Sequence, residues 1–338
     1  MPPAYLFEAF IAALIAFPVT AISTLGVISL MKELRLGQFI RSWGPKLHEH
    51  KSGTPTMGGL GILLGLGIAG GYIWFSLPST RNLLLLLFVS TFGFGLLGAL
   101  DDVLSLFRGK SMGLLPRQKL AGQVAFSLLF IHLSFHLLDK PRLISLPFTG
   151  VEFLMPVYAF YAFAVVVLVG TVNAVNLTDG LDGLAAGASL ITLLAFCLVL
   201  PVAALPIVIA LVAGIAGFAP NNFYPARVFM GDTGAFALGG FIGGLAVISR
   251  TELLLPFFGG LFFCEVLSVS AQVSYYKLTG GRIFKITPFH HHFESATGID
   301  YDYLLPNVEW PESLITTRLL VFHGLLAGFG LFAFYYLR

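Results

Sequence analysis

The chain has 338 residues, of which 57% are hydrophobic and 11% are charged, and its formal net charge is +2. This composition excludes an ordinary soluble globular protein, and the small net charge indicates no nucleic-acid partner. Apolar runs of about 20 residues recur, which is the length that crosses the hydrocarbon core of a bilayer. We therefore predict an all-α, multi-pass membrane protein that forms one integral membrane domain over residues 1–338.

Ten apolar runs follow one another along the chain. We predict membrane-spanning helices at 6–30, 58–78, 83–100, 120–138, 153–172, 185–200, 203–219, 235–249, 254–276 and 316–337. The sixth and seventh runs are separated only by the few residues around Pro201. Cys197 and Cys264 both lie inside apolar runs, so we interpret them as core residues rather than as a disulfide or metal ligands.

The basic residues are distributed unequally between the two ends of these runs. Fourteen of the nineteen Lys and Arg residues fall in or beside the loops after the first, third, fifth, seventh and ninth runs. Because cytoplasmic loops carry an excess of Lys and Arg, we expect these loops to be cytoplasmic and both termini to face outward.

Five carboxylates fall on this predicted cytoplasmic side. Asp101 and Asp102 end the third run, Asp179 and Asp182 lie in the fifth loop, and Asp232 lies in the seventh. Carboxylates that converge repel one another unless a cation lies among them, and hard oxygen ligands suit Mg²⁺. The alternative for each residue is a helix cap or a solvated loop charge, and for Asp232 a cap of the eighth run.

The stretch NAVNLTDGLDG at 173–183 carries the strongest signal because it adds amides and glycines to its carboxylates. Asn173 and Asn176 precede Asp179 and Asp182. The two carboxylates are three residues apart, so a helical turn would place them on one face. We expect this segment to line a polar site.

Two further loops on the same side hold candidate phosphate contacts. Lys51 and Thr56 lie just before the second run, where they could meet a phosphate or form a turn and cap; the spacing is not that of a P-loop. His290, His291 and His292 could contact an anion or lie in a surface loop. Glu265, inside the ninth run, must pair or face a cavity.

Five motifs in order resemble one protein family. They are GTPTMGG at 53–59, DD at 101–102, NAVNLTDGLDGLA at 173–185, FMGDTG at 229–234 and PFHHHFE at 288–294, with WPES at 310–313 and Arg318 in support. Together they resemble the bacterial phospho-N-acetylmuramoyl-pentapeptide transferases, a branch of the polyprenyl-phosphate N-acetylhexosamine-1-phosphate transferases. The resemblance covers nearly the whole chain.

The resemblance implies a reaction and its partners. Phospho-MurNAc-pentapeptide would move from UDP-MurNAc-pentapeptide to undecaprenyl phosphate, giving lipid I and UMP with Mg²⁺ as cofactor. The protein would lie in the lipid bilayer of the bacterial inner membrane, as a homodimer. A soluble nucleotide substrate arrives from the cytoplasm, which agrees with the side on which the carboxylates gather.

The resemblance also implies roles for single residues. Asp232 would bind Mg²⁺, with Asp102 or Asp179 as further ligands, and Asp101 would be the base that deprotonates or holds the lipid phosphate. A route through a covalent phospho-aspartate is the alternative to this one-step reaction. Phe229 would stack on uracil. The remaining expected substrate contacts are Lys51, Thr56, Asn173, Asn176, Asp179, Asp182, Asn222, Gln272, His290, His291 and His292.

Two departures from the family pattern stand out. Ser105 occupies a position where the family commonly has lysine, so Arg108, Lys110 or Lys119 would have to supply that cation. Residues 295–309 form a longer connection than expected. It could be a lid, a partner surface or a loop without a catalytic role, and we favour the last.

Two other functions are consistent with parts of the sequence. A UDP-GlcNAc:polyprenyl-phosphate GlcNAc-1-phosphate transferase would share the aspartates but lack the histidine triplet. A cation-coupled transporter would place its carboxylates near the middle of the spans, whereas here they gather at one side.

Overall fold

The computed structural model describes residues 2–37, 53–109, 112–138, 142–295, 301–306 and 308–336, and most of them are helical. The long helices are α1 (Pro2–Glu33), α2 (Gly59–Ser76), α3 (Arg81–Arg108), α4 (Pro116–Leu138), α5 (Val157–Thr178), α6 (Leu184–Val199), α7 (Leu205–Asn222), α8 (Gly231–Ser249), α10 (Gly260–Thr279) and α11 (Glu312–Tyr336). The short elements are η2 (Pro78–Thr80), β1 (Leu143–Ser145), β2 (Glu152–Leu154), η3 (Val202–Ala204), α9 (Leu255–Phe258) and η4 (Phe289–Phe293).

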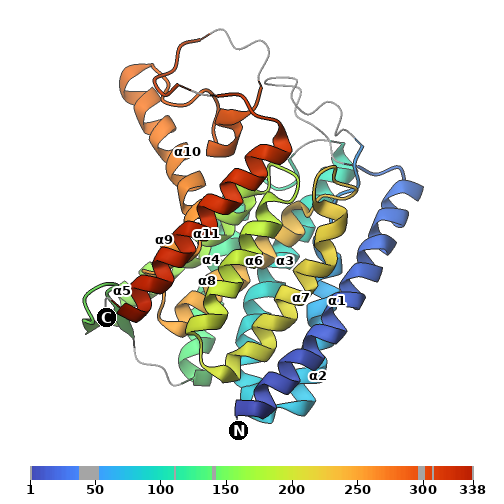
Figure 1. The fold of residues 1–338 in the computed structure, drawn as a ribbon, viewed down its shortest axis with the longest axis vertical. Helices are drawn as coiled ribbons and strands as arrows, with labels where there is room; N and C mark the ends of the chain where they lie inside the picture. The colour runs from blue at the N-terminus through green and yellow to red at the C-terminus, as the bar shows by residue number, and fades with distance from the viewer. Residues whose placement is uncertain are drawn as a thin grey trace.

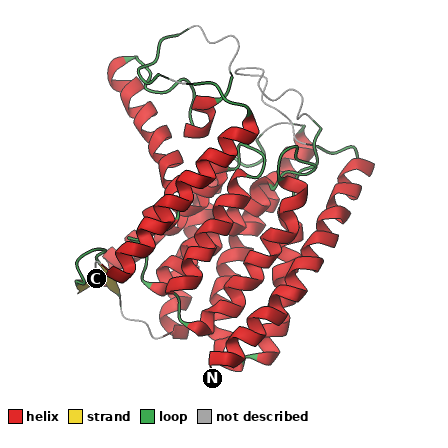
Figure 2. Ribbon diagram, viewed as in Figure 1, coloured by secondary structure: helices red, strands yellow, loops and turns green. Residues whose placement is uncertain are grey.

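The helices form a bundle in which successive helices alternate in direction. Figure 1 shows α1 beginning and α11 ending toward the lower part of the view, while α10 leans away from the bundle at the top. Figure 2 shows that loops connect the helices at both ends. Among the described residues, eight helices are long and apolar enough to cross a membrane, which confirms a multi-pass membrane protein.

Each predicted run overlaps a long helix, but several boundaries were wrong. The prediction ended the third helix at residue 100, whereas α3 continues to Arg108 and is closed by Gly109 at φ 59°. Likewise α5 continues to Thr178, so Asn173 and Asn176 lie in a helix and not in a loop. These extra turns are polar, and hydropathy therefore misses them.

Asp179 and Asp182 do not share a helical turn, which would have placed them on one face. Asp179 is the residue after α5, and a tight turn leads through Gly183, at φ 75°, into α6. Residue 183 therefore favours glycine, because other residues rarely adopt this left-handed conformation.

The fifth run was predicted to begin at residue 153, but Glu152–Leu154 forms a strand. It pairs antiparallel with Leu143–Ser145, and α5 begins only after Pro156. A residue before proline favours extended backbone, which explains why the helix does not start earlier.

The ninth run is interrupted. α9 ends at Phe258, Gly259 follows, and α10 begins at Gly260. The predicted break near Pro201 is real, because α6 ends at Val199 and η3 precedes α7. Cys197 and Cys264 are both free, as predicted.

α8 lies at the centre of the bundle and is buried along nearly its whole length. Its neighbours approach closely through glycines. A Cβ atom on Gly98 of α3 would lie 2.1 Å from the carbonyl oxygen of Asp232, and one on Gly59 of α2 would lie 2.2 Å from the Cα of Gly234. Small residues at such contacts let helices pack at short distance. This packing brings the start of α8 against the end of α3.

Candidate active site

A cavity of about 620 Å³ opens where the ends of α3, α5 and α7 meet the starts of α4 and α8. The fold therefore brings together motifs that lie far apart in the sequence. The cavity is lined by eleven of the predicted site residues: Thr56, Asp101, Asp102, Asn173, Asn176, Asp179, Asp182, Asn222, Phe229, Asp232 and His291.

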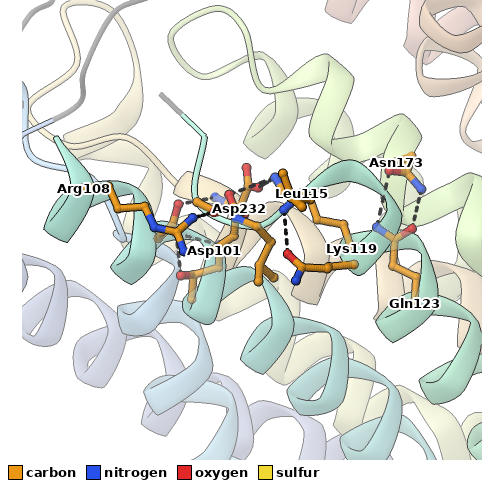
Figure 3. A network of polar contacts seen from close by, with 12 residues as sticks. Asp101, Arg108, Leu115, Lys119, Gln123, Asn173 and Asp232 are labelled. Atoms are coloured by element: carbon orange, nitrogen blue, oxygen red, sulfur yellow. Dashed lines mark hydrogen bonds and ion pairs between the residues drawn. The ribbon is translucent and has the colours of Figure 1, made fainter. Parts of the chain in front are cut away.

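The polar centre of the cavity is one lysine between two aspartates. The Lys119 Nζ atom donates to Asp232 Oδ2 at 2.7 Å and lies 2.8 Å from Asp101 Oδ2. The other carboxylate oxygen of Asp101 accepts a hydrogen bond from the Leu114 backbone at 2.6 Å. Figure 3 shows these side chains converging from α3, α4 and α8. The ammonium group offsets the repulsion between the two carboxylates.

Asp102 faces away from this lysine, toward the start of α8. Its Oδ1 accepts from the Asp232 backbone N–H at 3.1 Å, and its Oδ2 accepts from the Thr233 N–H at 2.9 Å and from the Thr233 hydroxyl at 2.6 Å. Asp102 thus caps α8 from another helix, because the first N–H groups of a helix have no partner within it. Asp232 lies in the first turn of α8, and its side chain bonds Lys119 instead.

The wall opposite Asp101 comes from α5 and the turn after it. The amide of Asn173 donates to Gln123 Oε1 at 2.8 Å and accepts from Gln123 Nε2 at 3.4 Å, as Figure 3 shows. Asn176 and Asp179 follow along the same wall. The Gln123–Asn173 pair therefore fixes α4 against α5 at the floor of the cavity.

Asp182 holds the far end of this wall. Its Oδ2 accepts from the Ala226 N–H at 2.8 Å, and its own N–H donates to Glu312 Oε1 at 2.8 Å. The turn after α5 is thereby tied to the loop before α8 and to the start of α11. Asp182 is buried and bonds the backbone, so it holds this turn in place as well as lining the cavity.

Two glycine-rich motifs meet at the side of Phe229. The Phe229 N–H donates to the Pro55 carbonyl at 2.8 Å, and the Gly58 N–H donates to the Phe229 carbonyl at 2.9 Å. Asn222 donates to the Val228 carbonyl at 3.1 Å, while its buried Oδ1 has no hydrogen-bond partner among the described residues. A buried acceptor in this state is a candidate ligand contact.

One histidine of the triplet lines the cavity, and the other two are buried. Only His291 lines the cavity, and its Nδ1 lies 2.7 Å from Glu294 Oε2. His290 is fully buried against Glu265. His292 accepts from the Lys285 N–H at 3.1 Å, and burial lowers its pKa; the positive charge of Lys285 lowers the pKa further, against a hydrogen bond to the Pro306 carbonyl.

Three other predicted residues, Gln272, His290 and His292, lie apart from the cavity lining. Gln272 uses its Oε1 to accept from the Ile283 and Phe284 N–H groups, both at 3.0 Å, and so holds the loop after α10. Lys51 lies outside the described residues. His290 and His292, discussed above, complete the group that the cavity does not expose.

One of the three cations expected to compensate for Ser105 lies between the aspartates. Ser105 lines the cavity, but Lys119 supplies the cation between the aspartates. Arg108 instead bonds the Gly113 carbonyl, and Lys110 lies outside the described residues. Gln123 was not predicted; its one-turn spacing from Lys119 on α4 was the available signal.

No group of three or more His, Cys, Asp or Glu side chains in the described part of the chain is placed to hold a metal ion. Mg²⁺ usually needs fewer protein ligands, because it keeps waters and binds through one or two carboxylates and substrate phosphates. The oxygen atoms of Asp232, with Asp179 on the same cavity, fit that mode. Asp102 fits it less well, because hydrogen bonds engage both its oxygens.

The amino-acid sequence is similar to one family model and to curated transferases. Residues 84–250 match glycosyl transferase family 4. Phospho-N-acetylmuramoyl-pentapeptide-transferase of Staphylococcus aureus strain MSSA476 is 43% identical over 291 residues, which is 84% of this chain and 90% of that protein. The transferase of the same name from Desulforamulus reducens is 43% identical over 290 residues, 84% of this chain and 86% of that protein. The chain therefore belongs to the phospho-N-acetylmuramoyl-pentapeptide-transferase family.

Proposed function

We propose that this chain transfers phospho-MurNAc-pentapeptide from UDP-MurNAc-pentapeptide to undecaprenyl phosphate, forming lipid I and releasing UMP. The observation that carries the proposal is the identity of 43% over 84% of the chain to transferases named for this donor group. The cavity supports it, because the motifs of the resemblance converge there on the Asp101–Lys119–Asp232 centre.

The proposed cofactor is Mg²⁺, held by Asp232 and Asp179. When bound, it would neutralise phosphate oxygens of the donor. Lys119 would keep its contact with Asp101 and present its positive charge to the same phosphates. Two anionic phosphates must approach each other in this reaction, so positive charge is the first requirement of the site.

The proposed chemical step is a direct displacement. An oxygen of the acceptor phosphate attacks the β-phosphorus of the donor; the new P–O bond forms as the bond to UMP breaks, and UMP leaves. The acceptor phosphate has a second pKa of about 6 and is mostly deprotonated near neutral pH. Asp101, fixed by Leu114 and Lys119, would therefore orient the acceptor and Lys119 more than it removes a proton.

The proposed nucleotide subsite lies at the other end of the cavity. Phe229 would offer an aromatic face to the uracil ring, and the buried Asn222 Oδ1 atom would accept a ligand N–H. Asn173 and Asn176 complete the polar wall beside it. His291 would contact the donor from the opposite side.

The proposed location is the bacterial inner membrane, with the cavity at its cytoplasmic face and the chain as a homodimer. The excess of Lys and Arg in the loops at the cavity end supports this orientation. A soluble nucleotide and a membrane lipid could then meet at one interface.

The test compares two donors. Purified protein in detergent receives undecaprenyl phosphate and either UDP-MurNAc-pentapeptide or UDP-GlcNAc, and UMP release is followed. We expect UMP release when the donor is UDP-MurNAc-pentapeptide and none when it is UDP-GlcNAc. Release only with UDP-GlcNAc would contradict the proposal and favour the GlcNAc-1-phosphate transferase.

A further inference from the structure

One buried acid, Glu265 of α10, has no part in the cavity described above and yet reaches its wall through a histidine. Glu265 and His290 are both fully buried. Their side chains meet between α10 and η4, and their closest atoms, Glu265 Oε1 and His290 Nδ1, are 3.1 Å apart. A carboxyl group in such a place must be paired, because burying an isolated charge is costly.

The carboxylate holds His290 at two points. Its Oε1 meets the ring Nδ1, and its Oε2 accepts from the His290 backbone N–H at 3.4 Å. A carboxylate can only accept, so the proton of the ring lies on Nδ1. Glu265 thereby fixes both the backbone and the ring orientation of His290.

The opposite edge of the ring faces the cavity wall. A Cβ atom on Gly180 would lie 2.3 Å from the His290 Nε2 atom, so the ring rests directly on the backbone between Asp179 and Leu181. The ring also contacts that of His291, with centroids 4.1 Å apart. Gly180 and His291 both line the cavity, and His290 lies behind them.

The Nε2 atom distinguishes His290 from a histidine that only fills the core. It is buried and has no hydrogen-bond partner in the described part of the chain. His323, equally buried, is fully engaged: its Nδ1 accepts from the Leu261 N–H at 3.1 Å, and its Nε2 lies 3.1 Å from the Ala188 carbonyl. An unsatisfied buried atom calls for a functional reason.

We propose that Glu265 is a positioning residue for the transfer reaction, which acts through His290 to hold the Asp179–Asp182 turn and His291 in the geometry that binds the donor. The proposal rests on the proposed function. It assigns Glu265 a role in donor binding without contact to the donor, because a wall displaced by about an ångström weakens catalysis strongly.

The test is a double-mutant cycle of Glu265→Gln and His290→Asn in the purified protein, with UMP release measured against each substrate. Glutamine keeps the volume of glutamate, but an NH2 group replaces one of the two oxygens. It therefore cannot accept from both the backbone N–H and the ring N–H of His290 in this geometry. We expect Glu265→Gln to raise the KM for UDP-MurNAc-pentapeptide about tenfold and to leave the KM for undecaprenyl phosphate within about twofold. Because Glu265 acts through His290, adding Glu265→Gln to His290→Asn should change the donor KM by less than about twofold.

Two further variants separate positioning from folding. Gly180→Ala presses on the same ring from the other side and should raise the donor KM, even if Glu265→Gln does not fold. His323→Asn, a change at a buried histidine that does not line the cavity, should lower the unfolding temperature without moving the donor KM. Independent, multiplying effects of Glu265→Gln and His290→Asn, or an unchanged donor KM in both Glu265→Gln and Gly180→Ala, would overturn the proposal. An inactive parent protein would instead count against the proposed function.

Discussion

Lys119 is the residue that makes the carboxylate cluster possible. Asp101 and Asp232 come from different helices, and each lies within 2.8 Å of the same ammonium group. Its side chain is one quarter exposed, so it remains accessible to a ligand that enters the cavity. In the free protein it offsets their repulsion, and in the proposed reaction it would face the donor phosphates.

Replacing Lys119 with methionine removes this charge while keeping most of the side-chain volume. We expect the rate of UMP release to fall by about 100-fold or more, because one preorganised charged donor is worth that much at a reacting phosphate. The measurement is kcat with saturating Mg²⁺ and both substrates.

Lys277→Met is the matched control, since Lys277 is an exposed residue in the last turn of α10. It should leave kcat within about twofold, as surface substitutions usually have small effects. Near-normal turnover by Lys119→Met would show that the ammonium group is not part of the reacting centre.

Most residues of the cavity could be predicted from the sequence, and the predicted residues that lie apart from its lining share a cause. Asp101, Asp232 and Asn176 stand out because polar groups beside apolar runs need a reason. Gln272 and His292 are equally polar, but they bond the backbone of the loops after α10. Sequence reveals the residue type but not which way a side chain points.

The start of α8 depends on Asp102, which belongs to another helix. Its carboxylate accepts three hydrogen bonds from Asp232 and Thr233, so it joins α3 to α8 directly behind the Asp101–Lys119–Asp232 centre. The helix N-terminus carries partial positive charge, which a carboxylate stabilises.

Asp102→Ala should therefore lower the stability of the folded protein. It leaves buried N–H groups without an acceptor, and we expect a loss of about 1–3 kcal/mol in the free energy of unfolding. The measurement is thermal unfolding in detergent. Asp101→Ala is the comparison, because it removes one backbone hydrogen bond, from Leu114, and the ion pair with Lys119, but no cap of α8. A loss below about 0.5 kcal/mol with Asp102→Ala would contradict the capping role.

The elements that hydropathy did not predict are those set by local chemistry. The strands at 143–145 and 152–154 precede Pro156, and the break between α9 and α10 falls at Gly259. A window of 20 residues averages over both features. The alternation of long helices, in contrast, follows from apolar length alone.

The bundle as a whole places every motif of the site at one end. The cavity is lined from the ends of α3, α5 and α7 and the starts of α4 and α8, as an alternating path of the chain requires. The hairpin of β1 and β2 lies on the connection from α4 to α5, at the other end.

The proposed orientation predicts which end meets the cytoplasm. In a protein whose Cys197 and Cys264 are replaced, Lys277→Cys should react with a membrane-impermeant maleimide in inside-out vesicles, and Thr149→Cys in right-side-out vesicles. Both residues are exposed. The reverse labelling pattern would contradict the cytoplasmic placement of the cavity.

The most direct measurement of the central claim follows both products of one reaction. Purified protein is given UDP-MurNAc-pentapeptide, undecaprenyl phosphate and Mg²⁺, and UMP and the polyprenyl-pyrophosphoryl sugar are quantified together. We predict equal amounts of the two products, none after chelation of Mg²⁺, and almost none with folded Asp232→Ala. UMP release without the lipid product, or near-normal products from Asp232→Ala, would contradict the assignment of this cavity as the site of transfer.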